Sequence, residues 1–537
     1  MIPARRATPV PLGQIRHECP VCSATDLRYE FLVDGVPACS CERCSLLFLN
    51  AHPAVTLDPQ TATVSSPPDE DEADDLGKAN VANLMSRLRR YAGLERGRLL
   101  WISAASKVAS NTECHGFDVT VLRPSSVEHD APLEMEGRFD VCVLDRGLET
   151  AKNPDRLLES VHRMLVPGGA LMAICPMLDS RAARLFRSHW WEFKRENRFY
   201  FTADTLQSLL SRTGYGDPII LRDKSLISLQ YIRTKLATMP RALRYRLLRL
   251  GLTLAPRSVS HRLFRLLDSR TTFLARAKPG RQQSVLSIVM PVYNERETFG
   301  QVMDQVLAKK LNGIDVEVIV VESNSNDGTR ELVRQYEDHP RVKVILEDRA
   351  KGKGHAVRRG FAAATGDVVL IQDADLEYDI EDYDALVDPI VHYQKNLVIG
   401  SRHTVQGRAW KMRQFNDAAG LAVFFNFGHV VFLTLFNLIY RQHLRDPFSM
   451  FKVFRRECLY GLSFECDRFD FDFELVIKLL RKGYRALELP VNYKARSFSE
   501  GKKVAVVRDP LTWLRALVKF RTSPLYAENP PEGAARV

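Results

Sequence analysis

The chain has 537 residues, a length that excludes a single ordinary domain and predicts two or three. Its composition, 45% hydrophobic and 26% charged, is that of a globular protein and excludes a disordered or fibrous chain. The net charge of +11 indicates an anionic partner such as lipid headgroups, sugar nucleotides or nucleic acid, without choosing among them.

The first residues, MIPARRATPVPLGQIRHE, contain no apolar core, so we expect no signal peptide. The chain has ten cysteines, five of them between Cys19 and Cys44. This distribution indicates a metal site plus scattered core thiols rather than an extracellular disulfide framework. We therefore expect a cytoplasmic protein.

Two Cys-x-x-Cys pairs, Cys19 with Cys22 and Cys41 with Cys44, stand eighteen residues apart. Together they offer four thiolates to one tetrahedral zinc ion, at a spacing typical of a zinc ribbon, here residues 15–50. Reduced cysteines in a small hairpin are the alternative, but so small a piece has little core without a metal. The predicted zinc is structural, because four thiolates leave no open position for catalysis.

Residues 51–80 include TLDPQTATVSSPPDEDEADD, which buries too little to fold, so we predict a solvated linker. Between residues 81 and 280, strand-like and helix-like stretches alternate. RLLWIS, FDVTVL, FDVCVLD and ALMAICP read as strands, and DRLLESVHRML reads as an amphipathic helix ended by VPGG. This alternation predicts a parallel α/β sheet.

The second half of this domain resembles the class I S-adenosylmethionine-dependent methyltransferases. The resemblance rests on FDVCVLDRGLETAKNPDRLLESVHRMLVPGGALMAICP and RFYFTADTLQSLLSRTGY, and TTFLARAKPG resembles the last strand of that fold. The zinc ribbon also resembles one that precedes a subgroup of the family. The resemblance implies a Rossmann-like domain that closes near Pro279.

Two cofactor determinants of that family are absent here. After the first strand the family carries an acid and a glycine loop, because the backbone must approach the cofactor closely, whereas this chain has SAASK from Ser103 to Lys107. After the second strand, Arg123 replaces the acid that binds the ribose. We expect a degenerate domain, a scaffold or docking module, that does not bind S-adenosylmethionine. A divergent but active methyltransferase is the alternative.

A basic helical insert is predicted within this domain over residues 225–270. From Ile232 to Arg270 it holds ten Lys or Arg residues and one acid, Asp268, among leucines at helical spacing. Two interpretations stay open. The insert is either an amphipathic surface on anionic lipid or a solvated hairpin whose basic side chains shield a packed leucine face.

A second alternation of strands and helices occupies residues 284–525. LSIVMPVYNE, VEVIVVESNSNDGT and VKVILE read as strands, and KGKGHAVRRGFAAAT as a glycine turn that leads into a helix. Unusual polar residues stand where strands end: Asn294 and Glu295, residues 322–327, Lys353, and the acids of DVVLIQDADLEYD. Because ligands of such sheets bind at the carboxyl ends of the strands, this convergence predicts a nucleotide site.

The acids of DVVLIQDADLEYD directly follow an apolar strand. Asp373 and Asp375 are two residues apart, so they share a face in extended backbone, with Glu377 in reach if the extension persists. Clustered carboxylates repel one another unless a cation lies between them. Oxygen ligands without His or Cys suit Mg²⁺ or Mn²⁺, which would neutralise a diphosphate leaving group, so these three acids predict a metal site.

These segments resemble family 2 glycosyltransferases of the GT-A fold, especially the dolichol- or polyprenyl-phosphate sugar synthases. The matching words, from about Val285 to Phe520, are MPVYNE, NSNDGT, KGKGHAVRRGF, TGDVVLIQDADLEYD, VIGSRH, RDPFSMFKVFRR and RFDFDFELVIKLLRKGYRALELPVNYKARSFSEGKK. The paired aspartates that the family carries after the second strand read Glu322-Ser323 here, which leaves one acid for the nucleotide base.

The resemblance implies roles for individual residues. Asp375 and Asp446 would be catalytic: Asp375 as a metal ligand together with Asp373 and Glu377, and Asp446 as a base or as the group that orients the acceptor. The nucleotide sugar would be bound by Pro291, Tyr293, Glu295, Glu322, Lys353, Asp373 and Arg402. The acceptor phosphate would be bound by Arg496, Lys502 and Lys503.

The uncharged run from Ala418 to Tyr440 is long enough to span a bilayer. A single span would put Asp446 and Asp375 on opposite sides, whereas the resemblance needs both in one site. We therefore expect a helix or helical pair that lies at the membrane surface or packs on the domain. Residues 526–537 are predicted to be a disordered tail.

The predicted protein is a metal-dependent, inverting glycosyltransferase, peripheral on the cytoplasmic membrane. It would move a sugar from a nucleotide sugar to a lipid phosphate, as cell-envelope polysaccharide synthesis requires, and no nucleic-acid partner is expected. Three alternatives stay open: transfer to a growing glycan, methyl transfer by the N-terminal half, and a pure scaffold, which the intact D-x-D motif disfavours.

Overall fold

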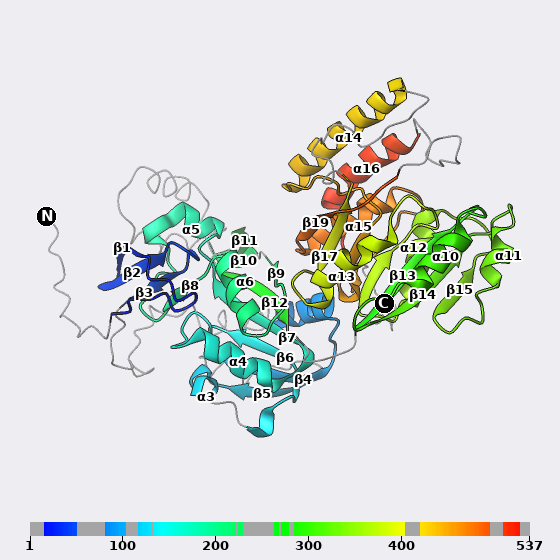
Figure 1. Cartoon of the computed structure of the whole chain (residues 1–537). Helices are drawn as coiled ribbons and strands as arrows, with labels where there is room; N and C mark the ends of the chain where they lie inside the picture. The colour runs from blue at the N-terminus through cyan, green and yellow to red at the C-terminus, as the bar shows by residue number, and fades with distance from the viewer. Residues whose placement is uncertain are drawn as a thin grey trace. The chain divides into compact units, whose positions relative to one another are not determined.

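The computed structural model divides into two compact units, Met1–Ser86 with Glu95–Pro279 and Arg87–Leu94 with Gly280–Val537 (Figure 1). It describes residues 15–50, 81–103, 116–129, 133–221, 224–228, 263–267, 270–278, 284–402, 419–494 and 508–526. The following predictions lie outside the described residues: the linker 51–80, residues 527–537 of the tail, most of the basic insert, Ala104 to Lys107, Arg496, Lys502 and Lys503.

A four-stranded antiparallel sheet carries the cysteine pairs. Its strands, in order, are β1 (Leu27–Val33), β2 (Val36–Cys41), β3 (Leu47–Leu49) and β8 (Phe199–Tyr200). Asp34 and Gly35 link β1 to β2 with φ angles of 46° and 83°, a turn that suits the twist of a two-residue hairpin. Because β8 comes from much later in the chain, the α/β domain that follows completes this sheet.

The first unit also contains a six-stranded sheet in the order β5-β4-β6-β7-β12-β9. Strands β5, β4, β6 and β7 are parallel neighbours, and β12 lies antiparallel between β7 and β9. The strands are β4 (Gly97–Ser103), β5 (Phe117–Leu122), β6 (Phe139–Asp145), β7 (Leu165–Pro176), β9 (Ile219–Leu221) and β12 (Arg270–Arg276). The helices are α3 (Pro124–His129), η2 (Leu133–Met135), α4 (Pro154–Met164), α5 (Arg181–Phe186), η3 (Arg187–His189) and α6 (Ala203–Arg212). This arrangement confirms the predicted α/β class.

The described ends of the predicted helical insert are strands, so that prediction is wrong there. β10 (Lys224–Ser228) and β11 (Leu263–Leu267) form an antiparallel ladder. Over so few residues apolar spacing does not separate helix from strand, and pairing the two ends satisfies the backbone groups of both. Arg270, which was assigned to the basic surface, opens β12 with a side chain only 17% exposed.

The second unit is built on a seven-stranded sheet in the order β15-β14-β13-β16-β18-β17-β19, in which β18 is antiparallel to β16 and β17. The strands are β13 (Ser284–Val292), β14 (Ile314–Glu322), β15 (Val342–Leu346), β16 (Val368–Ile371), β17 (Leu397–Ser401), β18 (Lys452–Arg455) and β19 (Ala486–Pro490). The helices include α10 (Phe299–Ala308), α11 (Thr329–Arg334), α12 (Lys353–Ala363), η4 (Ile380–Asp382), α13 (Tyr383–Val391), η5 (Arg456–Leu459) and α15 (Phe471–Lys482). Because β13, β14, β15 and β16 run parallel, their carboxyl ends meet at one edge.

Two further helices of this unit, α14 (Ala419–Tyr440) and α16 (Arg508–Thr522), lie side by side (Figure 1). Phe432 packs edge-on against Trp513, and the Tyr440 hydroxyl donates to the carbonyl of Leu517 at 2.6 Å. The apolar run is therefore one continuous helix packed on a second helix. Among the described helices, none combines the length and hydropathy that a membrane span requires.

A short segment from early in the chain belongs to the second unit. The π-helix η1 (Leu88–Ala92) and the turn at Gly93 precede β4 in sequence but pack with the C-terminal unit. The ring of Tyr460 lies 2.6 Å from where a side chain on Gly93 would begin, so only glycine fits there. The Arg90 guanidinium stacks over the ring of Tyr526 at 4.6 Å.

Candidate functional site

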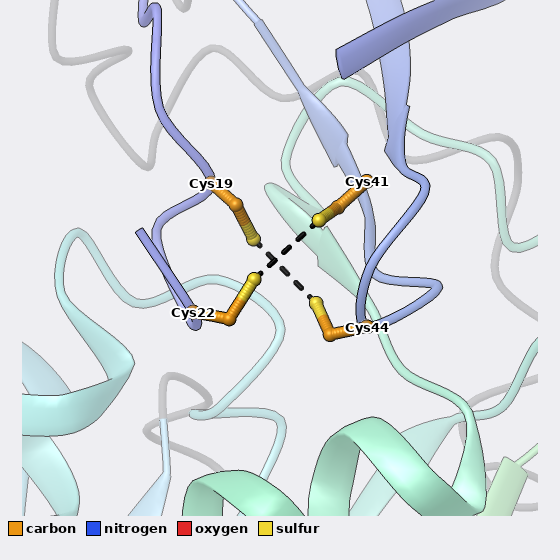
Figure 2. Close-up of side chains that lie close together, drawn as sticks. All are labelled: Cys19, Cys22, Cys41 and Cys44. Atoms are coloured by element: carbon orange, nitrogen blue, oxygen red, sulfur yellow. Dashed lines mark hydrogen bonds between the residues drawn. The ribbon is translucent and has the colours of Figure 1, made fainter. Parts of the chain in front are cut away.

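The four cysteines converge at the edge of the small sheet (Figure 2). All four Sγ atoms lie within 4.8 Å of one another, with Cys19 3.6 Å from Cys44 and Cys22 3.5 Å from Cys41. A hydrogen bond from the Cys44 thiol lowers the pKa of Cys19 to about 5, which favours the thiolate. Four sulfur ligands at this separation fit a tetrahedral zinc ion.

The two cysteine turns have the same backbone construction. Ser23 follows the first pair with φ of 56°, and Ser45 follows the second with φ of 59°. Each serine N–H donates at 2.9 Å to the carbonyl of the first cysteine of its pair, Cys19 or Cys41. Two matching turns orient two sulfurs each toward a common centre.

Buried acids surround Arg270 at the carboxyl edge of the first α/β sheet. Arg270 lies 3.6 Å from Glu149 and forms hydrogen bonds of 3.3 and 3.0 Å to Glu192. Glu149 is fully buried, neither of its carboxylate oxygens accepts a hydrogen bond from the described part of the chain, and burial raises its pKa to about 7. Burial also raises the pKa of Asp145. Arg123, by contrast, is exposed after β5.

The loops after β13 and β14 are joined by hydrogen bonds at the carboxyl edge of the second sheet. Asn294 N–H donates to Ser325 Oγ at 2.9 Å, and Asn294 Oδ1 accepts from Asn326 N–H at 3.0 Å. Glu295 N–H donates to Thr329 Oγ1 at 2.9 Å. Of the predicted nucleotide-sugar ligands on this loop, Tyr293 is exposed and Pro291 and Glu295 are half-buried.

Glu322 stabilises its own turn. It is fully buried, accepts a hydrogen bond of 2.6 Å from Ser325 N–H, and lies 3.4 Å from Arg330 Nε. Its other oxygen, Oε2, is the one near Arg330 and accepts no hydrogen bond from the described residues. The predicted contact of Glu322 with a nucleotide stays a prediction.

Lys353 and Asp373 form an ion pair, with Nζ and Oδ1 2.6 Å apart. Lys353 opens α12, and Asp373 follows β16 by two residues. Burial lowers the pKa of Lys353, but the charges of Asp373 and Asp472 outweigh it and raise that pKa. The two side chains are 19% and 15% exposed, so the pair remains accessible to a ligand.

The extended backbone expected through the metal-site acids ends at Asp375. The Asp375 side chain accepts a hydrogen bond of 3.1 Å from Glu377 N–H, and this contact forms a turn. The Glu377 carboxylate in turn accepts a hydrogen bond of 3.0 Å from the Tyr493 hydroxyl. Within the described part of the chain, the four cysteines alone form a group of three or more potential metal ligands within 4.8 Å. The convergence of Asp373, Asp375 and Glu377 on one ion stays a prediction.

Arg402 and Asp446 form a second, more deeply buried pair. Arg402 donates to Asp446 from Nε at 2.7 Å, from Nη2 at 2.8 Å and from its backbone N–H at 3.0 Å. Asp446 has no exposed surface, and its own N–H donates to Glu488 at 2.6 Å. Burial lowers the pKa of Arg402, but Asp446 and Tyr378 outweigh it, so the arginine stays charged.

Two charged residues that the sequence analysis did not single out complete this region. Lys452 is fully buried in β18 and donates from Nζ to the carbonyl of Ser449, and burial lowers its pKa. Asp472, on α15, has a pKa raised by burial and interacts with Lys452, Lys353 and Arg402. Lys452 ends the motif RDPFSMFK and Asp472 lies in RFDFDFE. In each case a charged residue among aromatic and other apolar residues was the sequence signal that could have identified it.

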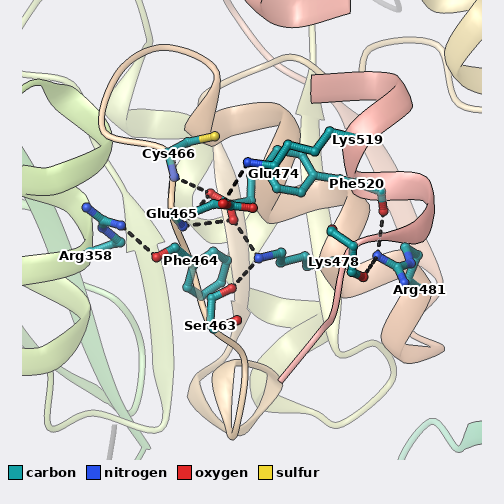
Figure 3. Close-up of polar contacts among 11 residues, drawn as sticks. Arg358, Ser463, Phe464, Glu465, Cys466, Glu474, Lys478, Arg481, Lys519 and Phe520 are labelled. Atoms are coloured by element: carbon teal, nitrogen blue, oxygen red, sulfur yellow. Dashed lines mark hydrogen bonds and ion pairs between the residues drawn. The ribbon is translucent and has the colours of Figure 1, made fainter. Parts of the chain in front are cut away.

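A hydrogen-bonded network fixes the loop that faces the start of α12 (Figure 3). Glu474 accepts from the backbone N–H groups of Glu465 at 3.0 Å and Cys466 at 2.8 Å, and from Lys478 Nζ at 2.6 Å. Arg358 of α12 donates to the carbonyl of Phe464 at 2.7 Å. A buried and fully paired charge of this kind holds loop, α12 and α15 in one arrangement.

Two protein families match parts of the chain. Residues 287–462 match the family described as Glycosyl transferase family 2, and residues 79–216 match a Methyltransferase domain. The chain is similar to the dolichol-phosphate mannosyltransferase of Pyrococcus furiosus, with 29% identity over 222 residues that cover 40% of this chain and 58% of that protein. This chain thus spans little more than half the length of that relative.

A dolichyl-phosphate beta-glucosyltransferase of Trichomonas vaginalis is 27% identical over 236 residues, which cover 42% of this chain and 70% of that protein. One similar solved structure is the glucosyl-3-phosphoglycerate synthase of Mycobacterium tuberculosis in complex with Mg²⁺ and uridine diphosphate. The match covers 45% of this chain and 80% of that protein, at 20% sequence identity. Its TM-score is 0.32.

Proposed function

We propose, from a C-terminal domain that belongs to glycosyltransferase family 2 and an N-terminal domain of the methyltransferase type, that this protein transfers a sugar from a nucleotide-sugar donor to a polyprenyl- or dolichyl-phosphate lipid. The transfer proceeds with inversion at the membrane surface and uses Mg²⁺ or Mn²⁺. The carrying observation is two cation–carboxylate contacts in one domain, the accessible pair Lys353–Asp373 and the buried pair Arg402–Asp446.

These contacts suit the recognition of a diphosphate. Lys353 and Arg402 are the cations for its oxygens, and each is held ready by a carboxylate. Asp373, Asp375 and Glu377 would hold the divalent ion, which supplies charge neutralisation of the leaving diphosphate when bound. Asp373 pairs with Lys353 here, so an Asp373 side chain that held the ion instead would leave Lys353 to contact the phosphates.

Asp446 acts here as a positioning group. Its two oxygens are occupied by three donors of Arg402, so it fixes the guanidinium plane beside Tyr493, whose ring lies 5.2 Å from Cζ. A lipid phosphate is already ionised at neutral pH, so its attack on the sugar carbon needs alignment more than a strong base. Arg496, Lys502 and Lys503 remain the proposed ligands of that phosphate.

Two observations support a lipid acceptor and a peripheral position on the cytoplasmic membrane. The names of both similar transferases include a dolichol-type phosphate. Leu438 on α14 is 74% exposed and Val518 on α16 is 63% exposed, and α16 also carries Arg515 and Lys519, the latter in an ion pair with Glu465. Exposed apolar side chains flanked by cations suit an anionic lipid surface.

The cysteine cluster is proposed as a structural zinc site. Its four sulfurs offer the soft donors that zinc prefers, and the two matching turns leave no fifth position. Elemental analysis of the purified chain should find about one zinc per molecule, the count of a four-cysteine site. A metal-free preparation in which residues 15–50 remain folded would contradict this assignment.

The acceptor decides between this proposal and transfer to a growing glycan. The full chain is incubated with Mg²⁺, a panel of nucleotide sugars and a membrane lipid extract, and lipids are analysed by mass spectrometry. We expect one polyprenyl phosphate species to gain the mass of one hexose. Consumption of donor with glycan products alone would overturn the lipid acceptor, and no consumption with any donor would overturn the transferase proposal.

A further inference from the structure

One buried acid of the second unit differs from the others in having no hydrogen-bond donor. The buried acids in the described part of this unit are Glu322, Glu347, Asp446, Asp472 and Glu474. All but Asp472 accept hydrogen bonds, respectively from Ser325 N–H, the Ser323 hydroxyl, Arg402 and Lys478. Glu347 also lies 2.6 Å from His355. The Asp472 carboxylate has neither a hydrogen bond nor an ion pair among the described residues, which indicates a partner that the chain itself does not supply.

A close approach of two helices places Asp472 beside the start of α12. Asp472 lies in the first turn of α15, directly after Phe471. The Cβ atom of Phe471 is 2.6 Å from where a Cβ atom on Gly354 would lie, so a glycine at this position lets the two helix starts meet. Gly354 directly follows Lys353, the proposed cation for the diphosphate. Asp472 and Lys353 therefore stand at neighbouring helix starts.

A stacked aromatic pair places Asp472 beside the loop of Asp446 as well. The ring of Phe473, the next residue of α15, stacks on the ring of Phe448 with 4.5 Å between the centroids. Phe448 follows Asp446 by two residues. The residues on either side of Asp472 thus pack against the two segments that carry the cation–carboxylate pairs of the proposed function.

Three cations attract the Asp472 carboxylate without pairing with it. They are Lys452, Lys353 and Arg402, and each is bonded to another group of the second unit. Burial raises the pKa of Asp472, and the three cations limit this rise. Asp472 is 9% exposed, so the hydrogen-bonding capacity of its carboxylate remains available to a ligand.

We infer that Asp472 accepts hydrogen bonds from hydroxyl groups of the transferred sugar and thereby contributes to the choice of donor. An ionised carboxylate only accepts hydrogen bonds, so sugar hydroxyls suit it, whereas phosphate oxygens are repelled by its charge. A divalent ion suits it less, because three cations already lie near it. The inference rests on the proposed function: if Lys353 and Arg402 bind the diphosphate, the attached sugar comes within reach of the acid held beside them.

Isothermal calorimetry of the full chain tests this inference, because it separates the sugar from its nucleotide. UDP-glucose, GDP-mannose and dTDP-glucose are each titrated with Mg²⁺ beside the free diphosphates UDP, GDP and dTDP. We expect Asp472→Ala to lower the affinity for the preferred nucleotide sugar about tenfold. The affinity for the free diphosphate should stay the same or rise, since the nearby cations lose a competing negative charge. Asp304→Ala, at an exposed position of α10, is the matched control.

Asp472→Asn separates hydrogen bonding from charge, and circular dichroism checks the folding of each variant. Asparagine keeps an acceptor oxygen without the charge, so the affinity for the nucleotide sugar should fall only about threefold. If Asp472 merely balanced the charge of Lys452, both variants would change the binding of nucleotide sugar and free diphosphate in parallel. Such a parallel change, or an unchanged affinity for the nucleotide sugar in Asp472→Ala, would overturn the inference alone. Absence of binding by every nucleotide and nucleotide sugar to the wild type would overturn the proposed transferase function as well.

Discussion

The carboxyl edges of the two α/β sheets hold charged clusters of opposite character. In the second unit Lys353 pairs with Asp373 and Arg402 pairs with Asp446, and the Lys353–Asp373 pair is partly exposed. In the first unit Glu149 and Glu192 share one arginine, Arg270, and the buried carboxylate of Glu149 accepts no hydrogen bond from the described residues. Pairs that can exchange partners suit the capture of a charged ligand, whereas an acid made partly neutral by burial suits a closed scaffold.

Removal of a metal-site acid in the second unit should have the largest effect. We expect Asp375→Ala to lower sugar transfer by about 10⁴-fold, because the charge of the leaving diphosphate is no longer neutralised. Transfer assays with circular dichroism as a check of folding measure this, and Asp388→Ala on exposed α13 serves as the control. Wild-type turnover in the presence of EDTA would contradict the metal-dependent mechanism.

Loss of the charge on Asp446 should have the next largest effect. Asp446→Asn preserves shape but weakens the hydrogen bonds to Arg402, so we expect turnover to fall several hundredfold, about 3–4 kcal/mol. Donor affinity should change much less, because Arg402 keeps its charge in this variant, whereas the alignment of its guanidinium during transfer depends on the carboxylate of Asp446. Separate measurement of donor binding and of kcat decides this, and an unchanged kcat would remove Asp446 from the site.

The buried acid Glu149 of the first unit should make the stability of that unit depend on pH. Glu149 has a folded pKa of about 7 against an ordinary value of about 4.3, so the folded state binds an extra proton between these values. Its contribution to stability is present below about pH 4 and is lost as the pH rises through 7, at most about 4 kcal/mol. Glu149→Gln should flatten this loss in urea unfolding between pH 5 and 8.

The matched control is Glu159→Gln, at an exposed position of α4, which should keep the wild-type slope. If Glu149→Gln and the wild type lose stability in parallel as the pH rises, Glu149 ionises normally in the folded unit. The proposed contrast between the two sheet edges would then fail.

The smallest expected effect is that of S-adenosylmethionine, which we expect neither to bind the chain nor to change its activity. Ser103 and Lys107 bound a segment without the glycine loop of the methyltransferase family, and Arg123 stands in place of the ribose acid. We expect no heat of binding when S-adenosylmethionine is titrated into the full chain at micromolar concentrations, and sugar transfer that does not depend on it. A micromolar dissociation constant would make the chain bifunctional.

The sequence was informative where the pattern is local. Alternation of apolar strands with amphipathic helices predicted both α/β domains, and the spacing of the cysteine pairs predicted their convergence. The sequence did not predict which distant segments pair. β8 completes the cysteine-bearing sheet, and β10 pairs with β11 where a helical insert was expected. No local pattern specifies such partners, because the free energy of a ladder depends on which two segments meet.

The candidate site divides in the same way. Lys353 and Asp373 were assigned to neighbouring parts of one site, and the structure places them in contact. The pairing of Arg402 with Asp446 and the Glu347–His355 contact were not foreseen, since each joins residues whose positions depend on how loops close over the sheet. Arg270 was mistaken for a surface cation because its charge, read alone, gave no sign of the buried acids that face it.

The placement of residues 87–94 in the second unit has a consequence for protein synthesis. Gly93 leaves the ribosome long before Tyr460 and Tyr526, the rings against which its segment packs. At ordinary elongation rates the interval is on the order of half a minute, long enough for the first unit to fold in the meantime. While the C-terminal half is made, residues 87–94 of the nascent chain therefore have no partner to pack against. A fragment that begins at residue 284 would lack this segment and leave the rings of Tyr460 and Tyr526 uncovered.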